Sequence, residues 1–149
     1  MFTIRVYGLL VDHGAAPRVL VMDELIKGRH ITKFPGGGLE YGEGPAECLV
    51  REIREELAME AKDLRHFYTT DFFQQSVFHE SPMQVISVYY SFTADHSQLT
   101  VLERPFAYTY EHQVEGARWL DIGQASVEAL SLPIDQRVMR MLKDQFSSL

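Results

Sequence analysis

The sequence predicts an α/β (α+β) fold with a mixed central sheet and helices packed on it. Three observations predict this class. Segments rich in Val, Ile, Leu and Tyr recur on both sides of the chain's middle, as strands do. A helix-start pattern follows a glycine-rich stretch between them, and an amphipathic segment closes the chain. The resulting order of three strands, a loop, a helix, three strands and a helix is typical of a layered sheet.

The first strands are expected to form a β-hairpin. Residues 3–11 and 18–23 are rich in strand-forming side chains and flank a turn-forming stretch at 12–17. Residues 25–33 then lead into a glycine-rich loop at 34–44, in which five glycines fall within nine positions. Such backbone freedom costs conformational entropy, so we expect the loop to need it.

The central helix is expected to begin at Pro45 and to end near Leu57. Gly44 suits the N-cap, proline suits the first helical position, and Glu47 places a carboxylate near the positive end of the helix dipole. Further strands are predicted at 64–71, 84–93 and 117–121, and a last helix at 134–146 after Pro133.

Length and composition restrict the function. A chain of 149 residues predicts a single domain, residues 1–149, and 46% hydrophobic with 23% charged residues is an ordinary globular balance. A net charge of −7 has the wrong sign for holding long nucleic acid by its phosphates. The lone Cys48 allows no internal disulfide, which predicts a cytoplasmic location, and no apolar run approaches the ~18 residues that span a membrane.

Three carboxylates are expected to share one face of the central helix. With 100° per residue, Glu55 lies about 60° to one side of Glu52 and Glu56 about 40° to the other, beside the apolar face. Carboxylates three and four residues apart repel, and a hard divalent cation such as Mg²⁺ or Mn²⁺ removes that penalty. The alternative is a solvated acidic face balanced by Arg51 and Arg54.

The loop and helix together resemble the Nudix box, the signature of the Nudix hydrolase family. Residues 37–59 carry its specified positions at the family's spacing, with Ala58 where the family has glycine. The matching sequence is Gly37-x5-Glu43-x7-Arg51-Glu52-Ile53-Arg54-Glu55-Glu56-Leu57-Ala58-Met59. The resemblance implies a Nudix-like α/β/α sandwich and the hydrolysis of a nucleoside diphosphate linked to another group, with Mg²⁺ or Mn²⁺ and an attacking water.

The same resemblance implies roles for individual residues. The metal is expected on Glu52, Glu55, Glu56 and the backbone carbonyl of Gly36, while Gly37, Glu43 and Arg51 are structural, with Arg51 fixing Glu43 and the loop to the helix. The catalytic residues are expected to be Glu55, Glu56 and an acid outside the box. Glu111 is our choice for that acid, with Glu103 and Glu115 as alternatives.

Substrate contacts are predicted on both sides of the box. Arg29 and Lys33 precede the glycine loop and are candidates for binding the phosphates, with solvated charges as the alternative. The ring of Phe73 is a candidate for stacking on a nucleobase, with a core position as the alternative.

The substrate is predicted only by class. Gln74 and Gln75 stand where ADP-ribose hydrolases of the family carry proline, and residues 76–78 lack the tyrosine of dinucleoside polyphosphate hydrolases. A small nucleoside triphosphate remains, cleaved by a pyrophosphohydrolase. A homodimer is expected for this enzyme, and no membrane partner is expected. The alternative function is a Nudix-like sensor that binds a nucleotide or metabolite without cleaving it.

The position of Ala58 offers two backbone paths. The family's glycine adopts a left-handed conformation just past the helix, which costs an L-residue about 1 kcal/mol. Ala58 either keeps that path under strain or lets the helix continue through Met59. We expect the kept path, because Glu56 must stay aimed at the metal.

Overall fold

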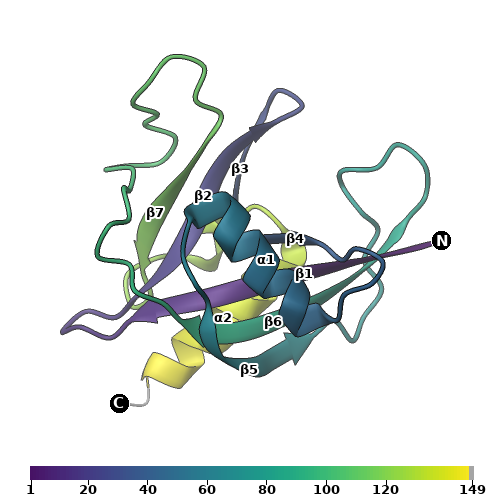
Figure 1. Ribbon diagram of the computed structural model, residues 1–149, viewed down its shortest axis with the longest axis horizontal. Coiled ribbons are helices and arrows are strands. Elements are labelled where there is room, and N and C mark those ends of the chain that lie inside the picture. Colours follow the sequence, from purple (N-terminus) through teal and green to yellow (C-terminus); the bar gives the residue numbers. More distant parts are fainter. Residues whose placement is uncertain (148–149) are drawn as a thin grey trace. The chain divides into compact units, whose positions relative to one another are not determined.

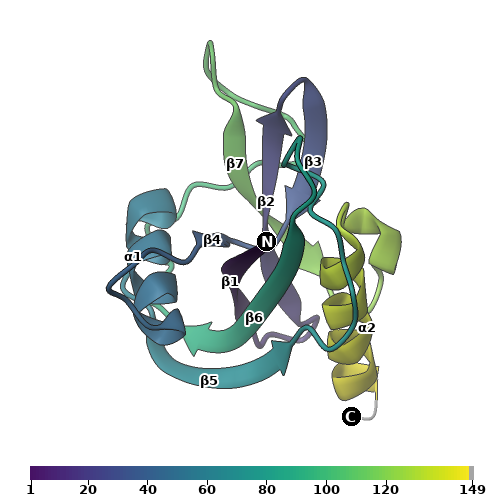
Figure 2. The same cartoon turned by 90° about the vertical axis from the view of Figure 1, so that its right-hand side faces the viewer.

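The computed structural model describes residues 1–147, and its elements follow the predicted order (Figures 1 and 2). The predicted class is confirmed, since a central mixed sheet is combined with two helices. Contacts divide the chain into two compact units. The first joins Met1–Leu9 to Pro35–Asp95, and the second joins Leu10–Phe34 to the chain from His96 onward.

The first unit holds the glycine-rich loop and the acidic helix. Its elements are the start of β1 (Phe2–Asp12), β4 (Gly36–Gly38), α1 (Pro45–Leu57), β5 (Lys62–Thr69) and β6 (Gln84–Thr93). β4 pairs antiparallel with β1, β6 neighbours β1, and β5 pairs antiparallel with β6 along the edge (Figure 1). The inner side of α1 buries Cys48, Leu49 and Ile53, which provides the apolar contact that a 13-residue helix needs for stability.

The second unit holds the other strands and the last helix. Its elements are the end of β1, β2 (Arg18–Ile26), β3 (Arg29–Lys33), β7 (Glu115–Asp121), the short helix η1 (Val127–Ala129) and α2 (Pro133–Ser147). β2 pairs antiparallel with β3 on one side and β7 on the other. α2, at the end of the chain in Figure 2, buries Val138, Met139 and Leu142, and Asp135 near its start accepts a hydrogen bond from the Phe34 N–H at 3.3 Å.

A buried carboxylate on β2 holds the long loop before β7 within the second unit. Asp23 is fully buried on β2, and its carboxylate accepts hydrogen bonds from Arg118 Nε at 2.7 Å and from Thr32 Oγ1 at 2.7 Å. Its second oxygen also accepts the backbone N–H of Phe106, which lies in the loop, at 3.2 Å. A buried charge is tolerated when paired and hydrogen-bonded in this way.

The structure refines the predicted boundaries at a few places. The segment 25–33 is split by a turn in which Lys27 and Gly28 have positive φ, so its ends belong to β2 and β3. The three-residue strand β4 was not predicted, because glycine has low strand propensity and pairs here only through the neighbouring β1 backbone. No helix in the described part of the chain is long and apolar enough to cross a membrane.

Candidate functional site

The acidic helix begins and ends as its sequence predicts. Gly44 is the N-cap in extended conformation, Pro45 opens the first turn, and the Glu47 carboxylate accepts the Gly44 N–H at 3.0 Å. At the other end Ala58 has φ 53° and ψ 36°, and its N–H bonds the Arg54 carbonyl at 3.1 Å. The left-handed path expected for Ala58 is therefore confirmed, and its methyl group carries the strain that glycine avoids.

Arg51 fixes the helix to the glycine-rich loop. Its Nε and Nη2 donate to the two carboxylate oxygens of Glu43 at 2.9 and 2.7 Å, and Nη2 also donates to the Gly38 carbonyl oxygen at 3.2 Å. The two parallel bonds to Glu43 form the bidentate geometry that makes arginine–carboxylate pairs strong. The structural role predicted for Arg51 and Glu43 has this geometric basis.

Glu43 is held as an anion by its surroundings. Besides the hydrogen bonds from Arg51, its Oε1 accepts the backbone N–H of Glu40 at 2.9 Å. These contacts, with Arg51 the larger, lower the Glu43 pKa from 4.5 to about 2. Glu43 in turn raises the pKa of Arg51 above its ordinary value.

The three predicted metal-binding carboxylates on α1 differ in their solvent exposure. The Glu52 side chain is 14% exposed and that of Glu55 is 60% exposed, while Oε2 of Glu56 is buried. Arg51 Nη1 lies 3.0 Å from Glu52 Oε1 and 3.2 Å from Glu55 Oε2. The guanidinium therefore balances two of the three charges on this face.

Glycines on β4 allow the strand to meet the acid face. An added β-carbon on Gly37 would overlap the Glu52 carboxylate, so the backbone approaches that carboxylate more closely than any side chain would permit. Gly36 has φ 148°, and its β-carbon would overlap the Val6 carbonyl oxygen on β1. The contact of Gly37 with Glu52 also places the neighbouring Gly36 close to the acid face.

The arrangement fits a hard divalent cation in its donor chemistry. Three carboxylates on one helix face, beside a glycine strand that leaves room at Gly37, supply the oxygen ligands that Mg²⁺ and Mn²⁺ prefer. Among residues 1–147, no three His, Cys, Asp or Glu side chains converge as a complete metal site. Arg51 Nη1 contacts both Glu52 and Glu55, so the guanidinium bridges two of the three carboxylates.

Cys48 contacts the same groups as Arg51, although it is not a predicted site residue. Its thiol is fully buried and donates to the Gly38 carbonyl oxygen at 3.5 Å, and its sulfur accepts from Arg51 Nη2 at 3.7 Å. Burial, with a smaller contribution from Glu43, raises the Cys48 pKa to about 12. The thiol therefore stays protonated and packs as a small apolar group.

The predicted base and phosphate-binding residues lie in the second unit. The Glu111 side chain is 88% exposed, with its Oε1 3.4 Å from His112 Nε2. Arg29 is exposed at the start of β3. Lys33 is 3% exposed and its Nζ lies 3.2 Å from Glu24 Oε1, so the alternative of a solvated charge is wrong for this residue.

Glu115 has electrostatic properties that the sequence did not reveal. It lies directly opposite Glu24 in the β2–β7 register. Burial and then the charge of Glu24 raise its pKa, while Lys33 lowers it by a smaller amount. A carboxyl with a raised pKa holds a proton more readily than an ordinary glutamate, which keeps Glu115 as an alternative to Glu111.

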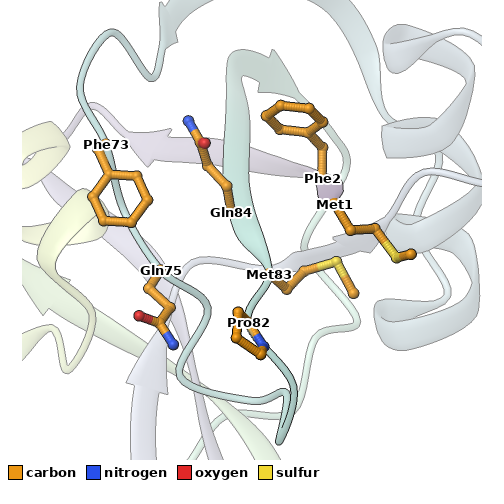
Figure 3. A pocket seen from close by; sticks show the side chains of 7 residues that line it. All are labelled: Met1, Phe2, Phe73, Gln75, Pro82, Met83 and Gln84. Atoms are coloured by element: carbon orange, nitrogen blue, oxygen red, sulfur yellow. The ribbon is translucent and has the colours of Figure 1, made fainter.

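Phe73 belongs to the first unit and is not a core residue. Its side chain is 69% exposed, on the segment between β5 and β6, so the alternative of a core position is wrong. It lines a small pocket whose other members include Phe2 and Gln84 (Figure 3). Sequence reasoning missed this pocket, because its residues lie at 1–2 and 73–84 and only the fold brings them together.

Comparison with known proteins identifies the family. The model of the NUDIX domain matches residues 1–142. The chain belongs to the Nudix family.

Individual relatives agree with this membership. A curated RNA pyrophosphohydrolase from Photobacterium profundum is 42% identical over 38 residues, which is 26% of this chain and 22% of that protein. The chain thus matches under a quarter of the length of that relative. A NUDIX hydrolase from Nitrosomonas europaea superposes with a TM-score of 0.67 and 16% identity, covering 99% of this chain and 90% of the other. A MutT structure, from work on Aliivibrio salmonicida and Vibrio cholerae, superposes with a TM-score of 0.60 and 17% identity, covering 97% of this chain and 99% of the other. At such identities these structures show the fold.

Proposed function

We propose that this chain is a metal-dependent Nudix pyrophosphohydrolase that cleaves a small nucleoside triphosphate. The observation that carries the proposal is the clamp of Arg51 on Glu43 and Gly38, which holds the face of three carboxylates on α1 against β4. A diphosphate bridge repels nucleophiles, so its hydrolysis needs cationic stabilisation, an oriented water and a proton acceptor.

The proposed metal ligands are Glu52, Glu55, Glu56 and the Gly36 backbone carbonyl. When bound, Mg²⁺ or Mn²⁺ supplies Lewis acidity that neutralises charge on the phosphoryl oxygens. The chain's own contribution is to hold these oxygens in place: Gly37 leaves room for the Glu52 carboxylate, and Arg51 fixes the loop that precedes the helix.

Water attack also requires a base, for which we propose Glu111. Its exposed carboxylate is accessible to water, and it accepts the water's proton as the new oxygen–phosphorus bond forms and the bridging phosphoanhydride P–O bond breaks, its electron pair leaving with pyrophosphate. Arg29 and Lys33 are proposed to contact the phosphates, and Lys33 also forms an ion pair with Glu24. Phe73 is proposed to contact the nucleobase.

The comparisons support the class of reaction. The curated relative is named an RNA pyrophosphohydrolase, and one structural neighbour is a MutT protein. The net charge of −7 favours a small nucleotide over long nucleic acid. The proposal also includes a single domain at 1–149, a cytoplasmic location and a homodimer. The family match through residue 142 supports the single domain. The lone, buried Cys48 supports the cytoplasmic location.

A substrate screen tests the proposed function. Nucleoside triphosphates, nucleotide sugars, ADP-ribose and dinucleoside polyphosphates are incubated with the protein and Mg²⁺, and released phosphate and pyrophosphate are measured separately. We expect turnover of a nucleoside triphosphate with release of pyrophosphate. Tight nucleotide binding without turnover of any compound would instead identify the sensor function.

A further inference from the structure

We propose that the pocket in the first unit is the subsite for the nucleobase of the substrate. The pocket has a volume of about 220 Å³ and is lined by residues from the start of β1, the segment after β5 and the start of β6. These residues are Met1, Phe2, Phe73, Gln75, Pro82, Met83 and Gln84 (Figure 3). The assignment rests on the proposed function, because it names where that enzyme holds the rest of its nucleotide.

The lining has the chemistry that recognises a planar, neutral, hydrogen-bonding group. None of the seven side chains is ionisable, although the lining residue Met1 also carries an α-amino group. The rings of Phe2 and Phe73 are 65% and 69% exposed, and Figure 3 shows the Gln84 side chain lying between them. Exposed rings supply stacking surfaces, and every nucleobase has a face on which to stack.

Two side-chain amides are available to the edge of a base. Within residues 1–147, neither the Gln75 nor the Gln84 side chain is hydrogen-bonded to another residue. A carboxamide presents a donor beside an acceptor, the pattern with which glutamine reads base edges. The two glutamines therefore add polar recognition to an otherwise apolar lining.

Backbone hydrogen bonds hold the pocket in shape. The Gln84 N–H donates to the Met1 carbonyl at 3.0 Å, and the Ser76 N–H donates to the Met83 carbonyl at 2.8 Å. Gln75 and Gln84 also form an antiparallel bridge. The three chain segments are thus joined before a ligand arrives, which reduces the entropy cost of binding.

The strand β1 connects this pocket with the acidic face of α1. Gly37 faces Glu52, and Val6 is its antiparallel partner, so the Val6 side chain points to the same side of the sheet. Alternate residues of a strand share a side, which places Phe2 on it too. Val6 is four positions beyond Phe2, about 13 Å along the strand. A nucleotide with its phosphates at α1 therefore extends toward the pocket along one face.

The volume limits the occupant to part of a nucleotide. Pockets that enclose whole drug-sized ligands measure roughly 300–1,000 Å³. At about 220 Å³ this pocket suits a single base, with the ribose and phosphates outside it.

Methionine NMR on the full-length protein tests the assignment directly. Two of the six methionines, Met1 and Met83, line the pocket, while Met139 is fully buried in the second unit. With methyl-labelled methionine, adenosine and cytidine are added without metal. We expect both pocket methyl signals to shift with nucleoside concentration while the Met139 signal stays unchanged, and ribose 5-phosphate to shift neither.

Kinetics supply the second test. Phe73→Leu removes the ring and keeps an apolar side chain, so we expect KM for the triphosphate to rise about tenfold while kcat changes little. Gln84→Met removes the amide at similar size, with an expected rise of about threefold. Phe146→Leu on α2 is the matched control, with KM within about twofold of the wild type.

Failure of the pocket and failure of the function are distinguishable. If the chain hydrolyses no nucleoside triphosphate with any divalent metal, the proposed function is wrong, and the nucleoside titration still decides the pocket. If hydrolysis occurs but nucleosides leave the Met83 signal unchanged and Phe73→Leu leaves KM unchanged, the pocket assignment is overturned. A Met83 shift produced by oligonucleotides and by no nucleoside would also overturn it.

Discussion

The carboxylate of Glu52 packs directly against the backbone of Gly37, in the space that any β-carbon at that position would fill. The contact joins α1 to β4 within the first unit, and Arg51 reinforces it by binding both Glu52 and the Gly38 carbonyl. A glycine and a carboxylate 15 positions apart in the sequence therefore define one side of the candidate metal site.

Gly37→Ala is predicted to damage activity more than stability. The methyl group displaces the flexible end of the Glu52 side chain, so the free energy of unfolding should change by less than about 1.5 kcal/mol while kcat falls at least roughly tenfold. Gly36→Ala is the comparison, because its methyl group meets the Val6 backbone at φ 148° and should also lower Tm clearly. Thermal melts beside turnover assays separate the two effects; equal loss of Tm in both variants would contradict this view.

The lowered pKa of Glu43 predicts a specific acid dependence of stability. A carboxylate whose pKa falls from 4.5 to about 2 on folding stabilises the native state above the higher value, and this contribution disappears as the pH falls through that range. Urea unfolding of the wild type and of Glu43→Gln should therefore differ most above about pH 5 and converge toward pH 2. A difference independent of pH across this range would show that Glu43 acts by packing alone.

Ala58→Gly is predicted to stabilise the protein by up to about 1 kcal/mol. Ala58 has φ 53°, and glycine relieves that strain by more than it adds freedom to the unfolded chain. Ala46→Gly is the control, since Ala46 is an exposed residue in the first turn of α1 where glycine should destabilise by roughly 0.5–1 kcal/mol. Chemical denaturation measures both; a loss of stability in both variants would refute the strain argument.

The three acids outside the box are separated by parallel kinetics. Glu111→Gln, Glu115→Gln and Glu103→Gln are assayed for kcat and for Mg²⁺ affinity. If Glu111 is the base, its variant loses turnover by roughly 10²-fold and keeps its Mg²⁺ affinity, while Glu103→Gln stays active. Loss confined to Glu115→Gln would show that the carboxyl with the raised pKa is the base instead.

The bounds of α1 were predictable because local sequence determines them. Gly44, Pro45 and Glu47 mark its start, and apolar spacing places Leu49 and Ile53 inward; the structure confirms Pro45–Leu57. The acid face follows from the same geometry. β4 escaped prediction because its strand character comes from β1 and not from its own three glycines.

Other features depend on residues that only the fold brings together. Lys33 lies beside Glu24 because β2 and β3 pair, and the Glu115 pKa is raised first by burial and then by Glu24, which lies opposite it in the β2–β7 register. No sequence pattern reports that register. The base-sized pocket combines the chain start with residues 73–84, and its glutamines match no motif.

Metal dependence tests the proposed function most sharply. Hydrolysis of the best nucleoside triphosphate is measured with Mg²⁺, with excess chelator, and in Glu55→Gln and Glu56→Gln, alongside thermal melts of each protein. We predict no turnover in chelator, recovery on adding Mg²⁺ or Mn²⁺, and a loss of at least roughly 10²-fold in each variant with Tm preserved. Wild-type turnover in excess chelator, or full activity in both variants, would contradict a metal site on the acid face of α1.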